Sequence, residues 1–326
     1  MALPLLLLAL AAAAHAQPNP HAYPAARAAK PVVIDGRIDD QWKHAPWTTY
    51  FVDIEGDAKP RPRFKTRAKM LWDENYFYIA AELEEPHVWG TLTKHDSVIF
   101  HDNDFEVFLD PNSDSHEYFE FEMNVLNTGW DLFLNKPYKD QGKADNGWEI
   151  PGLKTAVHID GTLNNHADTD KGWTLEIAFP WKAFAPAARM PLPPRKGDTW
   201  RVNFSRVEWR HEIHEGKYRR VPGTKEDNWV WSPQGKINMH LPEYWGYVRF
   251  VDKAAEGAQP DPLFSLRMQL QRYYQRQADF RKQNKRWAAP AEIPLDSGMK
   301  VTPSPEGWRA CLGGLCIRQD ALVEKN

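Results

Sequence analysis

The chain has 326 residues and a formal net charge of −3 at pH 7. This length accommodates one large domain with a small addition, or two ordinary domains. Because the charge gives no basic surface, we exclude nucleic acid as a partner. Tryptophan is abundant, with 15 copies. Most of these rings must fill a core, but indole also stacks on flat ligand faces.

Residues 1–16 predict a signal peptide. The run from Leu3 to Ala14 is almost wholly apolar, carries no preceding Lys or Arg, and ends in an Ala-His-Ala cleavage pattern. It is too short to cross a bilayer, and no later stretch is apolar enough to be a membrane span. We therefore expect a secreted or periplasmic protein. Residues 17–30 are rich in Ala and Pro and predict a flexible leader.

Residues 31–252 show short runs in which apolar and polar side chains alternate. The clearest runs cover residues 77–83, 105–109, 119–125, 130–134 and 173–179. A period of two predicts strands with one buried face. Many short strands of this kind predict an all-β, antiparallel, jelly-roll-like β-sandwich.

Residues 253–326 have a different character and predict a small appendage. Helical spacing from Leu263 to Trp287 indicates an amphipathic helix. Cys311 and Cys316 flank Leu-Gly-Gly-Leu, which predicts a two-residue hairpin with the two cysteines directly opposite. In an oxidising compartment we expect them to form a disulfide. We expect the appendage to pack on the sandwich; a protein partner bound through the helix is the alternative.

Five motifs occur in the order found in family 9 carbohydrate-binding modules, which are DOMON-like β-sandwiches. They are residues 33–42 (VIDGRIDDQW), 70–79 (MLWDENYFYI), 104–110 (DFEVFLD), 173–178 (WTLEIA) and 245–246 (WG). Residues 31–252 thus resemble this family, whereas residues 253–326 do not. The resemblance implies a jelly-roll-like sandwich that binds mono-, oligo- or polysaccharide, holds structural Ca²⁺, and serves polysaccharide catabolism without catalysing a reaction.

The resemblance also implies a set of site residues. The family's two tryptophans that enclose a sugar fall on Phe100 and Met239, and its sugar-binding arginine falls on Glu122. Its sugar-binding glutamate is matched by Glu106. Phe100 can still stack on a sugar ring, whereas Met239 offers a soft apolar contact.

The strand pattern alone predicts a similar site. Glu106 is out of phase with its apolar neighbours, so it points to the opposite face of its strand. Glu120, Glu122 and Asn124 alternate with apolar residues in the same way. If the two strands are neighbours, these groups share one sheet face and can accept sugar hydroxyls in charge-assisted hydrogen bonds. A solvated acidic face is an equally good interpretation.

Aromatic candidates for contact with a ligand are Trp89, Phe100, Trp209, Trp229 and Trp231. Core packing is the commoner use of any one tryptophan. We expect at least one of the five to contact the ligand.

Asp110, Asn112 and Asp114 supply oxygen atoms at alternate positions, a pattern that Ca²⁺ prefers. Residues 102–104 offer a similar pattern. A turn rich in Asp and Asn is the better interpretation of both segments.

Three alternative functions compete with sugar binding. A glycoside hydrolase would use Glu106 and Glu122 as acid and base. A DOMON-like haem protein would draw its ligands from the following residues: Met123, His158, His211, His214 and Met239. A structural or interaction module that has lost its sugar site is the third. The sequence has no G-x-S-x-G, H-E-x-x-H or phosphate-binding glycine loop.

Overall fold

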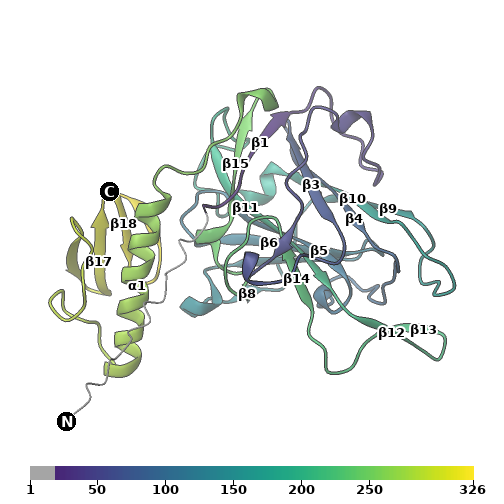
Figure 1. The fold of residues 1–326 in the computed structure, drawn as a ribbon. Helices are drawn as coiled ribbons and strands as arrows, with labels where there is room; N and C mark the ends of the chain where they lie inside the picture. The colour runs from purple at the N-terminus through teal and green to yellow at the C-terminus, as the bar shows by residue number, and fades with distance from the viewer. Residues whose placement is uncertain (1–18) are drawn as a thin grey trace, which may run out of the picture.

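The computed structural model describes residues 19–326, so the predicted signal peptide lies outside the described residues. A large β-sandwich is followed by a small unit that contains the long helix α1 (Figure 1). The sandwich strands are β1 (Ala22–Arg27), β2 (Val52–Asp53), β3 (Thr66–Trp72), β4 (Tyr76–Glu84), β5 (Asp104–Asp110), β6 (Tyr118–Asn124), β7 (Gly129–Leu134), β8 (Ala144–Asp145), β9 (Lys154–Asp160), β10 (Gly172–Pro180), β11 (Thr199–Glu208), β14 (Asp227–Val230) and β15 (Gly246–Val251). The hairpin strands β12 (His211–His214) and β13 (Lys217–Arg220) project from it.

These strands form one curled sheet in the order β8-β7-β6-β5-β11-β15-β1-β3-β4-β10-β9, with β14 paired to β11 and β2. The ends of the sheet fold over one another and enclose a core. Val107 of β5 and Phe121 of β6 are paired across strands, and both belong to the same buried cluster as Ile79 of β4 and Ile177 of β10. The predicted sandwich and its period-two pattern are confirmed here.

The predicted flexible leader is wrong for Ala22–Arg27. These residues form β1, which pairs in parallel with both β15 and β3, so the sheet is mixed rather than wholly antiparallel. Ala25 and Ala26 are buried, and the Tyr23 hydroxyl accepts a hydrogen bond from the Met70 amide at 3.0 Å. The small side chains that resemble a linker in the sequence fit instead between two neighbouring strands, and only Tyr23 carries a large apolar group.

The motif at residues 33–42 has a structural role at the edge of the sheet. Glu176 of β10 is fully buried, and its carboxylate accepts hydrogen bonds from the Trp42 indole at 2.6 Å and from the amides of Asp35 and Gly36 at 2.7 and 2.8 Å. Gly36 has φ +85°, and a Cβ there would lie 2.6 Å from the backbone of Val157. The glycine is therefore needed both for its conformation and for its close approach to β9.

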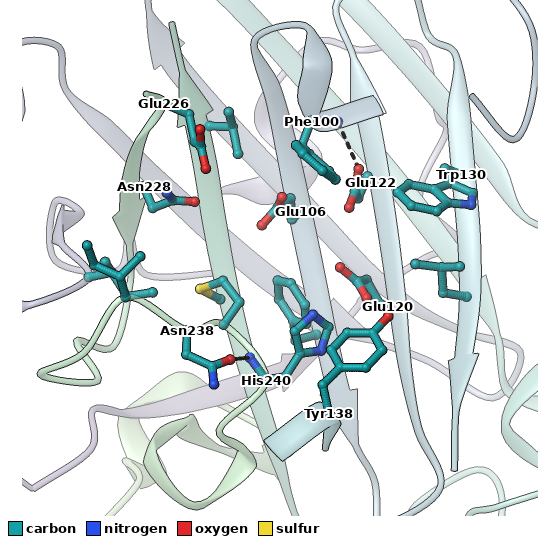
Figure 2. Close-up of a pocket in the computed structure, with 16 residues that line it drawn as sticks. Phe100, Glu106, Glu120, Glu122, Trp130, Tyr138, Glu226, Asn228, Asn238 and His240 are labelled. Atoms are coloured by element: carbon teal, nitrogen blue, oxygen red, sulfur yellow. Dashed lines mark hydrogen bonds between the residues drawn. The ribbon is translucent and has the colours of Figure 1, made fainter. Parts of the chain in front are cut away.

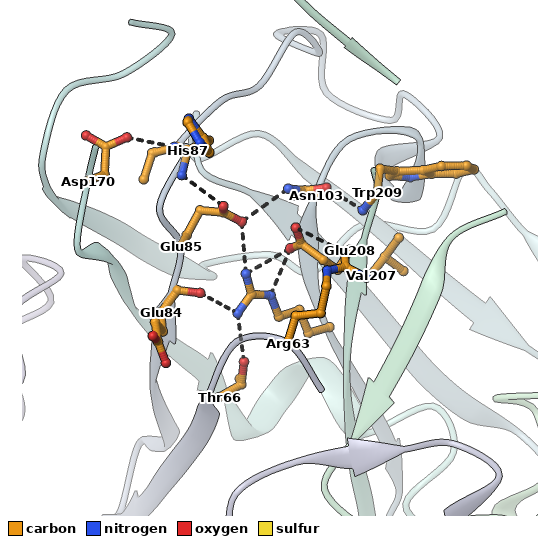
Figure 3. Close-up of polar contacts among 12 residues, drawn as sticks. Arg63, Thr66, Glu84, Glu85, His87, Asn103, Asp170, Val207, Glu208 and Trp209 are labelled. Atoms are coloured by element: carbon orange, nitrogen blue, oxygen red, sulfur yellow. Dashed lines mark hydrogen bonds and ion pairs between the residues drawn. The ribbon is translucent and has the colours of Figure 1, made fainter. Parts of the chain in front are cut away.

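A second buried carboxylate network ties β11 to the end of β4 (Figure 3). The Arg206 guanidinium, 1% exposed, donates to Glu85 at 2.9 Å and to Glu208 at 2.8 Å. It also donates to the Thr66 hydroxyl and the Glu84 carbonyl. One arginine thus balances two buried carboxylates.

Short 3₁₀ turns connect the strands, including the turn at Trp181–Phe184 (η5). The others are η1 (Asp40–Trp42), η2 (Gly56–Ala58), η3 (Ile99–His101), η4 (Tyr138–Asp140), η6 (Pro242–Tyr244) and η7 (Ala254–Glu256).

The C-terminal unit consists of α1 (Phe264–Asn284) and a sheet of β16 (Lys300–Ser304), β17 (Gly307–Leu312), β18 (Leu315–Arg318) and β19 (Val323–Lys325). The predicted disulfide between Cys311 and Cys316 is present across the β17–β18 hairpin. Tyr273 of α1 packs edge-on against Trp308, so the unit has an apolar cluster of its own. Between residues 19 and 326, no helix combines the length and apolar character that a membrane crossing requires.

This unit contacts the sandwich through a buried apolar cluster of Leu241, Tyr244, Phe264 and Met268, and through polar groups. The amide of Val323 donates to the carbonyl of Asp114 at 3.1 Å, and Arg267 of α1 donates to the carbonyl of Ser113. The Tyr274 hydroxyl donates to the Asp140 carboxylate in η4. The predicted packing of the appendage on the sandwich is thus observed.

Candidate functional site

The outer face of β5 and β6 forms the floor of a cavity of about 310 Å³. Glu106 and Phe108 come from β5, and Glu120 and Glu122 from β6. Figure 2 shows the three glutamate side chains side by side on neighbouring strands. They share this face because their apolar neighbours in each strand point into the core. The predicted acidic face therefore exists, and loops enclose it.

Strand register brings the floor residues together. Glu106 lies directly opposite Glu122, and on its other side it lies opposite Ser205 of β11. Glu122 lies opposite Trp130 of β7 in turn. Like charges placed directly opposite across two strands are destabilising unless something compensates them.

Two aromatic rings form one wall. Phe100, in the turn η3, has its ring centroid 6.4 Å from that of Trp130, with the planes 31° apart. The Phe100 amide donates to Glu122 Oε2 at 3.0 Å, and the Trp209 indole donates to the Phe100 carbonyl at 2.8 Å. These two hydrogen bonds fix the turn, so the ring of Phe100 is held beside the carboxylates.

Tyr138 and His240 form the opposite wall (Figure 2), with ring centroids 4.5 Å apart. His240 Nδ1 lies 2.9 Å from the Tyr118 hydroxyl. Burial lowers the pKa of His240 to about 4, so its imidazole is neutral at pH 7. Met239 completes this side, and its sulfur accepts a hydrogen bond from the Gln234 amide at 3.1 Å. The wall is uncharged.

The cavity is lined by acidic residues. Glu106, Glu120, Glu122 and Glu226 line it, and no lysine or arginine is among its described lining residues. Burial, with a smaller contribution from nearby Glu226, raises the pKa of Glu106 to about 7. Burial, reinforced by Glu106, raises the pKa values of Glu120 and Glu122 well above the usual range. Raised pKa values favour the protonated carboxyls, unless hydrogen bonds from a ligand or a bound cation stabilise the charged form.

The structure brings four of the predicted site residues together in the cavity: Phe100, Glu106, Glu122 and Met239. Asn124 lies further along β6, buried, where it donates to the Leu92 carbonyl at 2.8 Å and to Asp102 at 3.0 Å. Its amide is thus used inside the protein, away from the lining of the cavity.

The predicted tryptophans occupy other places. Trp229 and Trp231 belong to the main core, although the Arg63 and Arg206 guanidinium groups lie over the Trp229 ring. Trp89 is 3% exposed and packs against Tyr218 of the β12–β13 hairpin. None of these three is among the described residues that line the cavity.

Sequence reasoning missed several lining residues. Trp130 and Leu132 were expected to point into the core, yet they face the outer side, and Phe133 packs inward instead. Only the pairing of β7 with β6 determines which residues of β7 face the cavity and which face the core. Tyr138 and His240 come from separate loops, and no local pattern in the sequence joins them.

In the loop at residues 110–114, hydrogen bonds of a turn engage the carboxylates, and calcium binding there stays a prediction. Ser113 and Ser115 amides donate to the two Asp110 oxygens, and the Asn112 amide group donates to Asp114. The other Asp114 oxygen accepts from the His116 amide. Because these carboxylates are used within the turn, the Asp- and Asn-rich turn describes the loop better than a metal site.

The sequence profile described as "Carbohydrate family 9 binding domain-like" matches residues 34–193. A 156-residue segment is 28% identical to endo-1,4-beta-xylanase A of Thermotoga maritima and covers 47% of this chain and 12% of that protein. A 149-residue segment is 26% identical to exoglucanase XynX of Acetivibrio thermocellus and covers 46% of this chain and 11% of that protein. The chain thus spans only about an eighth of the length of these relatives.

Two solved structures show similar arrangements. A putative carbohydrate-binding protein from Bacteroides uniformis aligns with a TM-score of 0.53 at 13% identity, over 71% of this chain and 99% of that one. A family 9 module from Caldicellulosiruptor kristjanssonii, in complex with cellotriose, aligns with a TM-score of 0.47 at 17% identity, over 74% of this chain and 98% of that one. The first similarity supports the fold. With the profile match, the motifs and the sandwich in agreement, this chain carries a domain that belongs to carbohydrate-binding family 9.

Proposed function

We propose that the cavity over β5 and β6 binds the end or a short segment of a β-1,4-linked glycan, without cleaving it. The observation that carries this proposal is the combination of buried glutamates and aromatic rings in one cavity of a family 9 sandwich. The relatives are named as a 1,4-beta-xylanase and an exoglucanase, which supports xylan- and glucan-type ligands and a role in polysaccharide catabolism.

Recognition would combine stacking with hydrogen bonds to hydroxyl groups. The rings of Phe100 and Trp130 offer apolar faces for the C–H surface of a sugar. Glu106 Oε2 and Glu120 Oε2 have no hydrogen-bond partner among the described residues and can accept from sugar hydroxyls. A sugar that donates to them would satisfy groups that burial otherwise leaves unpaired.

The geometry favours binding over hydrolysis. A glycosidase places its two carboxyl groups on either side of the bond that it cleaves. Glu106 and Glu122 instead stand side by side on the floor, directly opposite one another on adjacent strands. A sugar above them meets both from the same side, which suits recognition rather than acid and base catalysis.

The protein is further proposed to be exported. The disulfide between Cys311 and Cys316 is typical of proteins in oxidising compartments, which agrees with the signal peptide expected over residues 1–16.

Glu106→Gln is expected to weaken oligosaccharide binding by about 1.5–3 kcal/mol, because a charged acceptor is lost. Titration calorimetry of the full chain with xylo- and cello-oligosaccharides measures this effect. The matched control is Glu212→Gln, a surface glutamate on β12 that pairs with Arg219. An affinity that is the same in Glu106→Gln and in wild type would remove Glu106 from the site, and no binding of any oligosaccharide by wild type would refute the proposal.

A further inference from the structure

A second feature of the cavity floor is the convergence of three carboxylates. Asp104, Glu106 and Glu122 each direct one oxygen atom toward the others, and these three atoms lie within 4.8 Å of one another. All three residues are buried, with exposures of 0%, 5% and 2%. Grouping three acids out of water is costly unless protons or a cation balance their charge.

Hydrogen bonds hold these carboxylates in place while leaving some of their oxygens unpaired. Asp104 Oδ1 accepts from the Val207 amide at 3.2 Å, and Glu122 Oε2 accepts from the Phe100 amide at 3.0 Å. In contrast, Asp104 Oδ2 and Glu106 Oε2 are enclosed and have no hydrogen-bond partner in residues 19–326. Buried carboxylate oxygens of this kind can accept a hydrogen bond or coordinate a cation.

The protein supplies no counter-charge of its own at this point. No lysine or arginine occurs among the described residues that line the cavity, and the nearby Arg206 is already paired with Glu85 and Glu208. Burial and the surrounding carboxylates also raise the pKa of Asp104 well above its usual range. Every group that acts strongly on this cluster is therefore an acid or a hydrogen-bond donor.

We propose that Asp104, Glu106 and Glu122 bind a divalent cation, calcium by the chemistry of the site, at the floor of the cavity. Carboxylate oxygens are hard ligands, which calcium and similar cations prefer. Two oxygens that each lie about 2.4 Å from one calcium ion are at most about 4.8 Å apart, which agrees with the observed limit of 4.8 Å. The site is separate from the loop at residues 110–114, whose carboxylates are already used in the turn.

The cation has coordination positions to spare. Calcium takes about six to eight oxygen ligands, more than three carboxylates provide. Because Glu106 and Glu122 also line the cavity, the remaining positions face the space where the proposed function places a sugar. This step rests on the proposed function: sugar hydroxyls complete the coordination of the calcium ion, so calcium strengthens sugar binding.

The test uses the full chain, freed of metal with a chelator and then titrated with CaCl₂, and separately with MgCl₂, in a calorimeter. We expect one calcium ion per chain at this site. Glu122→Gln should weaken calcium binding about tenfold or more, because one charged ligand is lost. Asp114→Asn, in the loop at residues 110–114, should leave the affinity within about twofold of wild type.

Melting curves distinguish a variant that no longer binds calcium from one that no longer folds. Glu122→Gln removes one of several buried like charges, so without calcium it should melt no lower than wild type. Calcium should then raise the melting temperature of wild type and of Asp114→Asn, but not that of Glu122→Gln. Calcium binding that survives in Glu122→Gln and disappears in Asp114→Asn would overturn the proposal, as would the absence of saturable binding.

Sugar titrations with and without calcium distinguish the two proposals. If calcium binds as described and no oligosaccharide does, the cation site stands and the proposed function fails. If an oligosaccharide binds and calcium does not, the cation site fails and the proposed function stands.

Discussion

Arg206→Met is expected to destabilise the sandwich by about 3–5 kcal/mol, because it removes the arginine paired with the buried Glu85 and leaves the buried Glu208 only the more distant Arg63, at 4.0 Å. The methionine fills much of the same volume, so lost packing contributes little. Burial already raises the pKa of Glu208 well above its usual range, a shift that Arg206 opposes. Urea unfolding at pH 7, followed by tryptophan fluorescence, measures the change in the free energy of unfolding.

The matched control is Arg219→Met, which removes an arginine from a surface pair with Glu212. Exposed ion pairs contribute about 0–1 kcal/mol, so this variant should unfold close to wild type. If the two arginine variants lost equal stability, Arg206 would not be the counter-charge that holds β11 to β4.

Glu176→Ala is expected to cost about 3 kcal/mol or more, because it leaves the Trp42 indole and the amides of Asp35 and Gly36 without an acceptor. All three bonds are short, and Glu176 and Trp42 are fully buried. The free energy of unfolding in urea reports the effect. Glu176→Gln keeps one side-chain oxygen and should lose less than the alanine variant, whereas equal losses would contradict a role as the shared acceptor.

The part of the site that lies on β5 and β6 was predictable from the sequence. Glu106 and Glu122 alternate with buried residues, and a period of two assigns them to a common face once β5 and β6 are neighbours. The resemblance to the family motifs independently assigns Glu106 to the site and predicts Phe100 as another contact with the sugar. Local pattern and family motif agree at these positions because both depend on strand geometry.

The enclosure of the site was not predictable, because it depends on contacts between distant segments. The acidic face resembles a solvated surface in the sequence, yet Tyr138 of η4 and His240 cover it from loops about 100 residues apart. The face of β7 that Trp130 occupies is set by its register with β6. Likewise, the short Ala- and Pro-rich β1 has no alternation of its own, and only its two parallel neighbours make it a strand.

A crystal structure of the chain with a xylo- or cello-oligosaccharide tests the location of the binding site most directly. We expect a sugar ring beside Phe100 and Trp130, with hydroxyl groups within hydrogen-bond reach of Glu106 or Glu120. A sugar bound on another face of the sandwich, with this cavity filled only by water, would contradict the account.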